Sequence, residues 1–208
     1  MNEKFVINIG RQLGSGGRQI GEKLAAQFGI GFYDKELINI ASKESGLGKE
    51  FFEKADEKQS HSIIGGLLGL RTNISNEVYV NNYLSNETFF KIQSDVIRDL
   101  AEEKSCVFVG RCADYILRDH PRSINVFITA DTKDREKRVA LDQKLTLVKA
   151  HDVIEKTDKK RAEYYNYFSN KVWGAAESYH LCINSSVLGI DETVTFIRRF
   201  IEQKLVIK

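Results

Sequence analysis

The sequence lacks the features that mark several common classes of protein. Its three cysteines, Cys106, Cys112 and Cys182, are far apart and form no Cys-x-x-Cys pair, so neither a zinc site nor a disulfide framework is supported. Free thiols of this kind fit a cytoplasmic protein. No apolar stretch is long enough to cross a membrane, and residues 1–10 are too short for a signal peptide and lack a cleavage site. We therefore expect no membrane partner.

An excess of charge of one sign is also missing. The chain has 31 Lys and Arg against 29 Asp and Glu, a net charge of +2, whereas a dedicated nucleic-acid binder is usually strongly basic. We expect no nucleic-acid partner. The hydrophobic share of 42% is typical of a globular protein, and 208 residues fit a single domain, 1–208, with an inserted subdomain.

Apolar segments of strand length alternate with amphipathic helical segments along the chain. Strands are expected at 4–9, 31–33, 106–110, 124–130 and 180–184, and helices at 17–28, 34–44, 86–103 and 191–205. Apolar strands separated by helices predict an α/β fold in which a parallel five-stranded sheet carries helices on both faces. Ligands of such sheets bind beyond the carboxyl ends of the strands.

Residues 45–85 interrupt this alternation. The segment holds a cluster of three glycines, Gly65, Gly66 and Gly69, which predicts a mobile connection. We interpret 45–85 as an insertion into the α/β domain. A second segment, 142–163, carries many charges and few large apolar residues, so we expect it to have little to bury and to be mobile.

The stretch RQLGSGGR follows the first expected strand and opens the first expected helix. Gly14, Gly16 and Gly17 permit backbone conformations in which several N–H groups surround an anion, and the helix adds the positive end of its dipole. Strand, glycine loop and helix in this order predict a phosphate-binding loop. The alternative is a tight turn that is packed for structural reasons.

No standard phosphate-loop pattern matches this stretch. Against G-x-x-x-x-G-K-[ST] only Gly16 is retained, with Gly17 in the place of lysine and Arg18 in that of Ser or Thr. The pattern G-x-G-x-x-G fails at Gln19. A hydrolase elbow around Ser15, with His180 as its base, lacks the first glycine of G-x-S-x-G and has no other support.

Five segments in order, GRQLGSGGRQIGEKLA, FYDKELI, VFVGRCADYIL, DKKRAEYYNYFS and INSS, give the chain a resemblance that covers nearly its whole length. Together they resemble the cytidylate kinase-like family of P-loop nucleoside monophosphate kinases. The resemblance implies a P-loop NTPase-like parallel sheet with an NMP-binding insertion, matching 45–85, and a lid, matching 142–163.

The resemblance also implies roles for single residues, with ATP and Mg²⁺ as cofactors. The donor phosphates would be held by the loop residues Arg11, Gly14, Ser15, Gly16, Gly17, Arg18 and Gln19. Asp34 would face the acceptor and Arg111 would hold its phosphate. Asp158 and Arg161 would contact the acceptor and the transferring phosphate. The ligands of Mg²⁺ stay open, with Asp114 and Ser15 as candidates.

Each of these roles has a structural alternative. Asp34 suits the N-cap of a helix, and Arg18 is placed to pair with Glu22 four residues further on. The charged run 156–161 is typical of a solvated helix face. The chain also departs from the family where Val109 replaces an acid. Arg18 and Arg11 are the cations near the loop in sequence, and we expect Arg18 to supply the charge of the missing lysine.

Taken together, the sequence predicts ATP-dependent phosphoryl transfer to a nucleoside monophosphate, with CMP or dCMP as the leading acceptor. One rival is a regulatory protein that binds nucleotide without catalysis, because the lysine and the acid are missing. The other is a kinase of a different small molecule, because acceptor choice would reside in 45–85. The sequence leaves the oligomeric state open.

Overall fold

A computed structural model describes residues 4–34 and 77–206, with side chains from residue 87 onward in the second range. The chain divides into two compact units, Met1–Lys35 with Arg98–Lys208, and Glu36–Ile97. The sheet, the glycine loop and the cavity described below all belong to the first unit. The helix expected at 34–44 and the part of the predicted insertion up to residue 76 lie outside the described residues.

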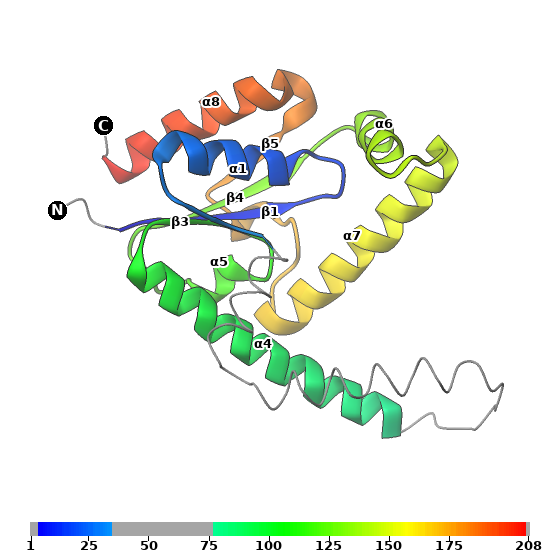
Figure 1. Ribbon diagram of the computed structural model, residues 1–208, viewed down its shortest axis with the longest axis horizontal. Helices are drawn as coiled ribbons and strands as arrows, with labels where there is room; N and C mark the ends of the chain where they lie inside the picture. Colours follow the sequence, from blue (N-terminus) through cyan, green and yellow to red (C-terminus); the bar gives the residue numbers. More distant parts are fainter. Residues whose placement is uncertain (1–3, 35–76, 207–208) are drawn as a thin grey trace. The chain divides into compact units, whose positions relative to one another are not determined.

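Five parallel strands form the sheet, in the order β2-β3-β1-β4-β5 (Figure 1). Their bounds are Val6–Arg11 for β1, Gly31–Tyr33 for β2, Cys106–Val109 for β3, Ser123–Thr129 for β4 and Leu181–Asn184 for β5. The predicted sheet is thus confirmed. Strand β1 continues further than expected, because Gly10 and Arg11 pair with Phe127 and Ile128 of β4.

The helices are α1 (Gly17–Phe28), α4 (Glu77–Glu103), α5 (Ala113–Ile116), α6 (Thr132–Gln143), α7 (Leu147–Ser169) and α8 (Ser185–Leu205), with a 3₁₀ turn at Ala176–Ser178. Helix α1 has the bounds that the sequence predicts. Helix α4 begins before residue 86, inside the segment that was assigned to the insertion. Helix α8 begins before residue 191, and Gly189 with φ 74° and ψ 174° kinks it.

One face of the sheet is an apolar core beneath α1 and α8, which lie side by side in Figure 1. Alternate strand residues such as Ile7 and Ile9 point to this side, and Leu24 of α1 and Ile197 of α8 close it. All four side chains are at most 1% exposed. The period of two in the strands and of 3.6 in the helices accounts for this division.

The other face of the sheet is covered by α5, the C-terminal part of α7 and the segment that follows it (Figure 1). Phe127 of β4 packs against Trp173 and Tyr179, with ring centroids 5.2 and 4.9 Å apart. Asn8 of β1 is buried here, and its Nδ2 donates to Asn125 Oδ1 at 2.9 Å. Helices therefore cover both faces, as predicted.

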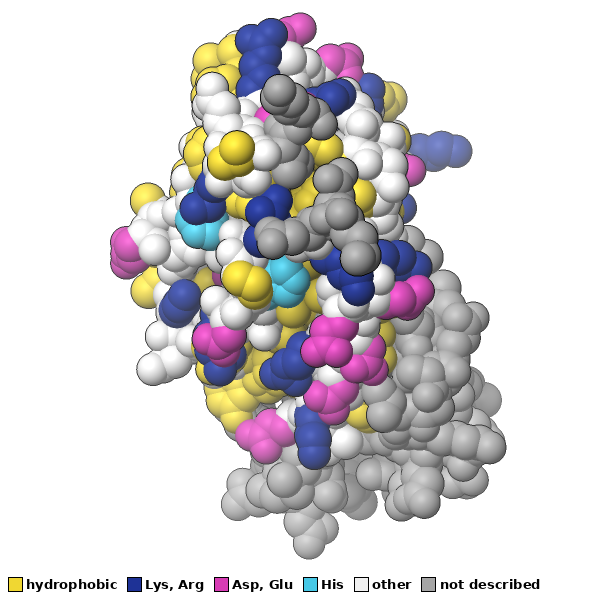
Figure 2. All heavy atoms as spheres, turned by 90° about the vertical axis from the view of Figure 1, so that its left-hand side faces the viewer, with side chains coloured by type: hydrophobic (Ala, Val, Ile, Leu, Met, Phe, Trp, Pro, Cys, Tyr) yellow, Lys and Arg dark blue, Asp and Glu magenta, His cyan; other side chains and the backbone are white. Residues whose placement is uncertain are grey.

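Figure 2 views the side of the molecule that lies on the left in Figure 1. Acidic and basic side chains are interspersed on this face, and no single sign dominates it. All three cysteines are free thiols, Cys106 and Cys112 buried and Cys182 exposed. Within 4–34 and 77–206, no helix combines the length and the apolar character needed to span a bilayer.

Candidate active site

The glycine loop connects β1 to α1 at the carboxyl end of the sheet. Gly14 and Gly16 have φ values of 77° and 78°, a region that favours glycine. Ser15 is buried, and its hydroxyl donates to Gln12 O at 2.8 Å. Helix α1 has no side-chain cap. None of the hydrogen bonds found among the described residues uses the N–H groups of Gly14, Gly16 or Gly17, which are the donors such loops offer to phosphate.

Packing also requires these glycines. A Cβ at Gly14 would lie 2.7 Å from the carbonyl oxygen of Arg135, and a Cβ at Gly16 would collide with Ile190 Cδ1. A tightly packed turn and an anion-binding loop are therefore compatible explanations of the glycines, since close packing keeps the N–H groups in a fixed arrangement.

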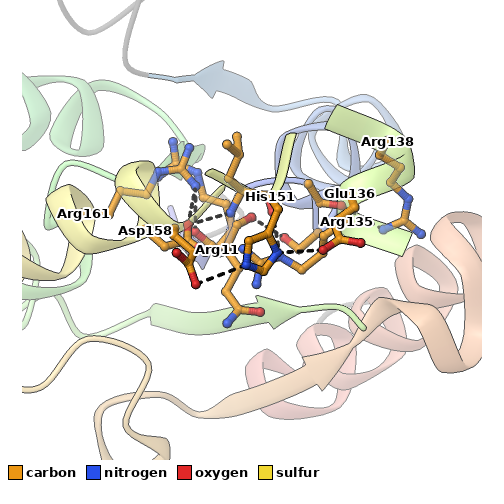
Figure 3. Close-up of polar contacts among 12 residues, drawn as sticks. Arg11, Arg135, Glu136, Arg138, His151, Asp158 and Arg161 are labelled. Atoms are coloured by element: carbon orange, nitrogen blue, oxygen red, sulfur yellow. Dashed lines mark hydrogen bonds and ion pairs between the residues drawn. The ribbon is translucent and has the colours of Figure 1, made fainter. Parts of the chain in front are cut away.

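Three arginines from α6 and α7, all labelled in Figure 3, bond to carbonyl groups of the loop. Arg135 Nε donates to Leu13 O at 2.7 Å, and Arg138 Nη1 donates to Gly14 O at 3.0 Å. Arg161 Nη1 donates to Arg11 O at 3.0 Å. These three guanidinium groups place positive charge around the loop, and a binding site for a polyanion needs such charge.

Asp158 fastens α7 to the same loop. Its Oδ1 accepts the N–H of Leu13 at 2.8 Å, and its Oδ2 pairs with Arg135. Arg161, one helical turn further on, lies 3.7 Å from Oδ1. The run 156–161 is therefore split: Asp158 and Arg161 turn towards the loop, whereas Lys156 and Lys159 are exposed as on a solvated face. Lys160 is exposed too, and it lines the cavity described below.

Sequence reasoning missed Arg135 and Arg138. They belong to the charged segment that follows β4, and the signal that was available is the position of this segment after a strand's carboxyl end. Helices α6 and α7 are also joined by His151 Nδ1 and Glu136 Oε1, 2.7 Å apart (Figure 3). The predicted lid, 142–163, buries Ala150 and Ile154 in a small apolar cluster. It thus has more to bury than its composition indicates, and its mobility stays a prediction.

Arg18 lies on the side of α1 that faces β2. Its Nε is 2.8 Å from Asp34 Oδ2, its Nη1 is 3.3 Å from Glu22 Oε2, and its guanidinium lies 5.6 Å from the Phe32 ring. The alternative pairing with Glu22 is therefore present. The Asp34 side chain is only 5% exposed. The roles predicted for Arg18 at the donor and for Asp34 at the acceptor stay predictions.

A cavity of about 350 Å³ opens at the carboxyl ends of β1 and β3, on the face opposite the apolar core. Aromatic and charged side chains share its wall: Tyr164, Tyr165, Trp173 and Tyr179, together with Arg11, Arg111, Asp114, Lys160 and Arg161. Its size suits a small ligand. Because Gly10 and Arg11 form part of the wall, the cavity adjoins the glycine loop.

Arg111 stands where the chain leaves β3, at the edge of the sheet where the sequence places it. Gly110, Arg111 and Cys112 all have positive φ, at 82°, 59° and 54°. For two residues other than glycine this is a strained conformation, which the surrounding structure must hold in place. The guanidinium lies 5.7 Å from the ring of Tyr164, and burial raises the pKa of Tyr164 to about 12. The strained turn directs Arg111 into the cavity.

Asp114 lies within the cavity wall and accepts a hydrogen bond from Tyr165 Oη at 2.7 Å. Burial raises the pKa of Asp114 above its ordinary value, so that a proton is held more readily. Ser15, the other candidate metal ligand, has its hydroxyl bonded to Gln12 O. No group of three His, Cys, Asp or Glu side chains in the described part of the chain is arranged to hold a metal ion.

Ser15 and His180 do not form a catalytic pair. The hydroxyl of Ser15 donates to Gln12 O, whereas His180 Nδ1 accepts the N–H of Asn125 at 2.9 Å. The geometry gives the hydrolase alternative no support.

Comparison with known proteins agrees with this geometry. The model of the cytidylate kinase-like family matches residues 6–187. No curated protein matches the chain. The crystal structure of an uncharacterized protein from Eubacterium ventriosum is 27% identical with a TM-score of 0.72, covering 96% of this chain and 99% of that one.

Two shikimate kinase structures share the fold at lower identity. The enzyme from Bacteroides thetaiotaomicron is 14% identical with a TM-score of 0.53, covering 98% of this chain and 99% of that one. The enzyme from Acinetobacter baumannii, in complex with shikimate, is 15% identical with a TM-score of 0.51, covering 98% and 96%. The parallel sheet, the glycine loop and the family match agree, and the chain belongs to the cytidylate kinase-like family.

Proposed function

We propose that the protein transfers the γ-phosphoryl group of ATP to a nucleoside monophosphate, with CMP or dCMP as the leading acceptor. The observation that carries the proposal is the adjacency of two parts. A glycine loop with three N–H donors and three bound arginines adjoins a cavity that is lined by further arginines and by aromatic rings. Free cysteines favour action in the cytoplasm.

The donor phosphates would bind at the loop residues 14–19. Their negative charge would be met by backbone N–H groups and by the positive end of α1. Arg138 and Arg161 already donate to carbonyls of this loop, and each carries further N–H groups that can reach an anion. Arg135 and Asp158 would act by holding the loop in shape, since both are bonded to Leu13.

The acceptor would bind in the cavity. Arg111 and Arg161 suit a phosphate because a guanidinium binds two of its oxygens at once. Tyr164, Tyr165 and Trp173 suit a flat nucleobase, since aromatic side chains stack on base rings. This combination of charge and aromatic surface favours a nucleoside monophosphate over an acceptor without an aromatic ring.

The proposed reaction is an in-line displacement. An oxygen of the acceptor's phosphate attacks the γ-phosphorus, a new P–O bond forms, the bond to the oxygen bridging the β- and γ-phosphates breaks, and ADP leaves. The chain's arginines would neutralise the charge that spreads over the transferred group. Mg²⁺ would neutralise phosphate charge when bound, and Asp114 and Ser15 are the side chains that could contribute to holding it beside phosphate oxygens and water.

Two rival functions remain as outcomes of a test. A nucleotide-binding regulatory protein is favoured by Gly17 in the place of the lysine, and a kinase of another small acceptor by the fold shared with shikimate kinases. The test is ATP consumption, measured with each of a panel of nucleoside monophosphates and with shikimate. Binding of ATP alone is measured by calorimetry alongside.

Each outcome separates the three functions. Turnover that depends on CMP or dCMP supports the proposal, and turnover with another acceptor supports the second rival. Binding of ATP without turnover supports a regulatory protein. Absence of both binding and turnover would exclude the assignment of the glycine loop as a nucleotide site.

A further inference from the structure

At two positions of the P-loop pattern this chain has exchanged the residue types, a glycine and a cation. Aligned with G-x-x-x-x-G-K, the stretch RQLGSGG has Arg11 where the first glycine belongs and Gly17 where the lysine belongs. The pattern's glycine and cation are thus both present, each at the position of the other. An exchange of this kind has a physical meaning if the two positions touch.

Positions 11 and 17 do touch. A Cβ built on Gly17 would lie 2.5 Å from Arg11 Cβ and 2.9 Å from Arg11 Cγ, closer than real side chains approach. Gly17 has no positive φ, so its backbone accepts any residue, and it is the stem of Arg11 that leaves room for glycine alone. Since Cβ is fixed by the backbone, no rotation of Arg11 relieves this contact.

The head of the Arg11 side chain reaches the cavity. A Cβ on Gly110 would collide with Arg11 Nη1 and would lie 3.0 Å from its Cζ, so the guanidinium lies directly against Gly110. Gly110 and Arg111 form the cavity wall where β3 ends, and Arg11 lines the same cavity. The side chain therefore begins at the glycine loop and ends at the cavity.

Arg11 is also held at its base. It is the last residue of β1, paired with Ile128 of β4, and its carbonyl accepts the bond from Arg161. A cation on a sheet strand, with its backbone fixed in this way, is placed more rigidly than one on a loop.

We propose that Arg11 replaces the P-loop lysine, and that Gly17 is glycine because it must admit the Arg11 stem. The guanidinium lies between the glycine loop and the cavity, so it contacts the phosphoryl group that passes from donor to acceptor. This inference rests on the proposed function. It assigns the lysine's role to Arg11 and leaves Arg18 as a partner of Asp34 and Glu22.

The test combines a stability arm with a binding arm. In the stability arm, Gly17→Ala is expected to lower the melting temperature, because its Cβ meets the Arg11 stem. Adding Arg11→Gly to Gly17→Ala is expected to raise it again, which is the signature of two residues in contact. This arm needs no nucleotide. An unchanged melting temperature in Gly17→Ala would overturn the steric half of the proposal.

In the binding arm, Arg11→Met keeps the stem and removes the charge. Its affinity for ATP is expected to fall about tenfold or more, the scale of one charged hydrogen bond, and its affinity for ADP is expected to fall less. Turnover is expected to fall about 10²-fold. The double variant Arg11→Gly/Gly17→Lys, which restores G-x-x-x-x-G-K, is expected to bind ATP more tightly than Arg11→Met. Arg199→Met, exposed on α8, is the matched control and is expected to behave as the parent.

The outcomes distinguish this inference from the proposed function. If the parent binds ATP and Arg11→Met binds it equally well, Arg11 is not the substitute for lysine, while the proposed function stands. If the parent binds no ATP, the proposed function and the role of Arg11 as a phosphate ligand both fail. The stability arm then still decides whether Arg11 and Gly17 form a packed pair.

Discussion

Strand β1 presents two different faces to the protein, and the comparison of these faces separates stability from function. On one side Ile7 and Ile9 are buried in the apolar core under α1 and α8. On the other side Asn8 and Gly10 line the cavity, and the Nδ2 of Asn8 donates hydrogen bonds to Asn125 Oδ1 and Ser123 Oγ. The cavity face of β1 thus buries less apolar surface than the core face, and its polar lining leaves room for a ligand.

Substitutions on the two faces should therefore have different consequences. A change in the core should alter the free energy of unfolding and leave the ligand affinity of the folded protein intact. A change in the cavity wall should alter the ligand affinity or the turnover and leave the free energy of unfolding almost unchanged. The following predictions test this separation, from the largest expected effect to the smallest.

The largest effect is expected from Ile197→Ala in α8, whose side chain is fully buried in the core. Large-to-small changes of this kind cost about 2–5 kcal/mol because a cavity is left behind. We expect a loss of this size in urea unfolding, with an unchanged dissociation constant for ATP below the unfolding transition. A weakened affinity in the folded state would show that the two faces are coupled.

Arg111→Met is the counterpart on the cavity face. It removes the charge while keeping much of the length of the side chain. Position 111 has a positive φ, which strains methionine and arginine alike, so the substitution adds no backbone strain. We expect turnover to fall about 10²-fold, the scale of one preorganised charge contact. The urea midpoint should stay close to that of the parent, and a large drop would assign Arg111 to structure instead.

Asp114→Asn should change how stability depends on pH. Burial raises the pKa of Asp114 in the folded state, so the folded form favours the protonated carboxyl. Its contribution to stability is complete below the unfolded pKa of 3.8 and is lost as pH rises through the higher folded value. Urea unfolding at a series of pH values should show this loss in the parent and not in the variant. Parallel curves would indicate that Asp114 titrates alike in both states.

The smallest effect is expected from His151→Gln in α7, whose side chain contacts Glu136 and Glu155. Glu136 and Glu155 raise the pKa of His151, so its ion pairs stabilise the protein at acid pH and fade as pH rises through the folded pKa. The variant should therefore melt at a lower temperature than the parent near pH 6, and the two should converge above pH 8. A difference that grows with pH would contradict these pairings.

The sequence predicts the sheet and α1 well because their signals are local. Gly29, which follows α1, adopts the left-handed conformation that commonly ends a helix, and the glycine loop precedes the first residue of α1, so both bounds have local signals. The start of α8 was placed too late, because the helix begins at Ser185 through the Asn184 cap and the prediction began beyond the kink at Gly189. Asn8 and Gly10 alternate with Ile7 and Ile9 along β1, and this alternation agrees with a cavity on one face and an apolar core on the other.

The candidate site was harder to predict because its contacts join distant parts of the chain. Arg135 and Arg138 reach the glycine loop only through the packing of α6, and a charged helix alone gives no sign of this. Arg18 was chosen for its position in sequence, and the sequence indicated its pairing with Glu22 but not the one with Asp34. Its role at the donor phosphates stays a prediction. The contact between positions 11 and 17 requires the turn of the loop, which a linear pattern does not describe.

The segment after α7 contains a tryptophan whose fluorescence can report ligand binding. Trp173 is the one tryptophan in the sequence, and it lies in the cavity wall against Phe127. Indole emission shifts with local polarity, so the tryptophan fluorescence of the unmodified protein reports the surroundings of Trp173 in the cavity wall. A titration followed at the tryptophan emission maximum, together with protection from acrylamide quenching, would show which molecules enter the cavity without labels or coupled enzymes.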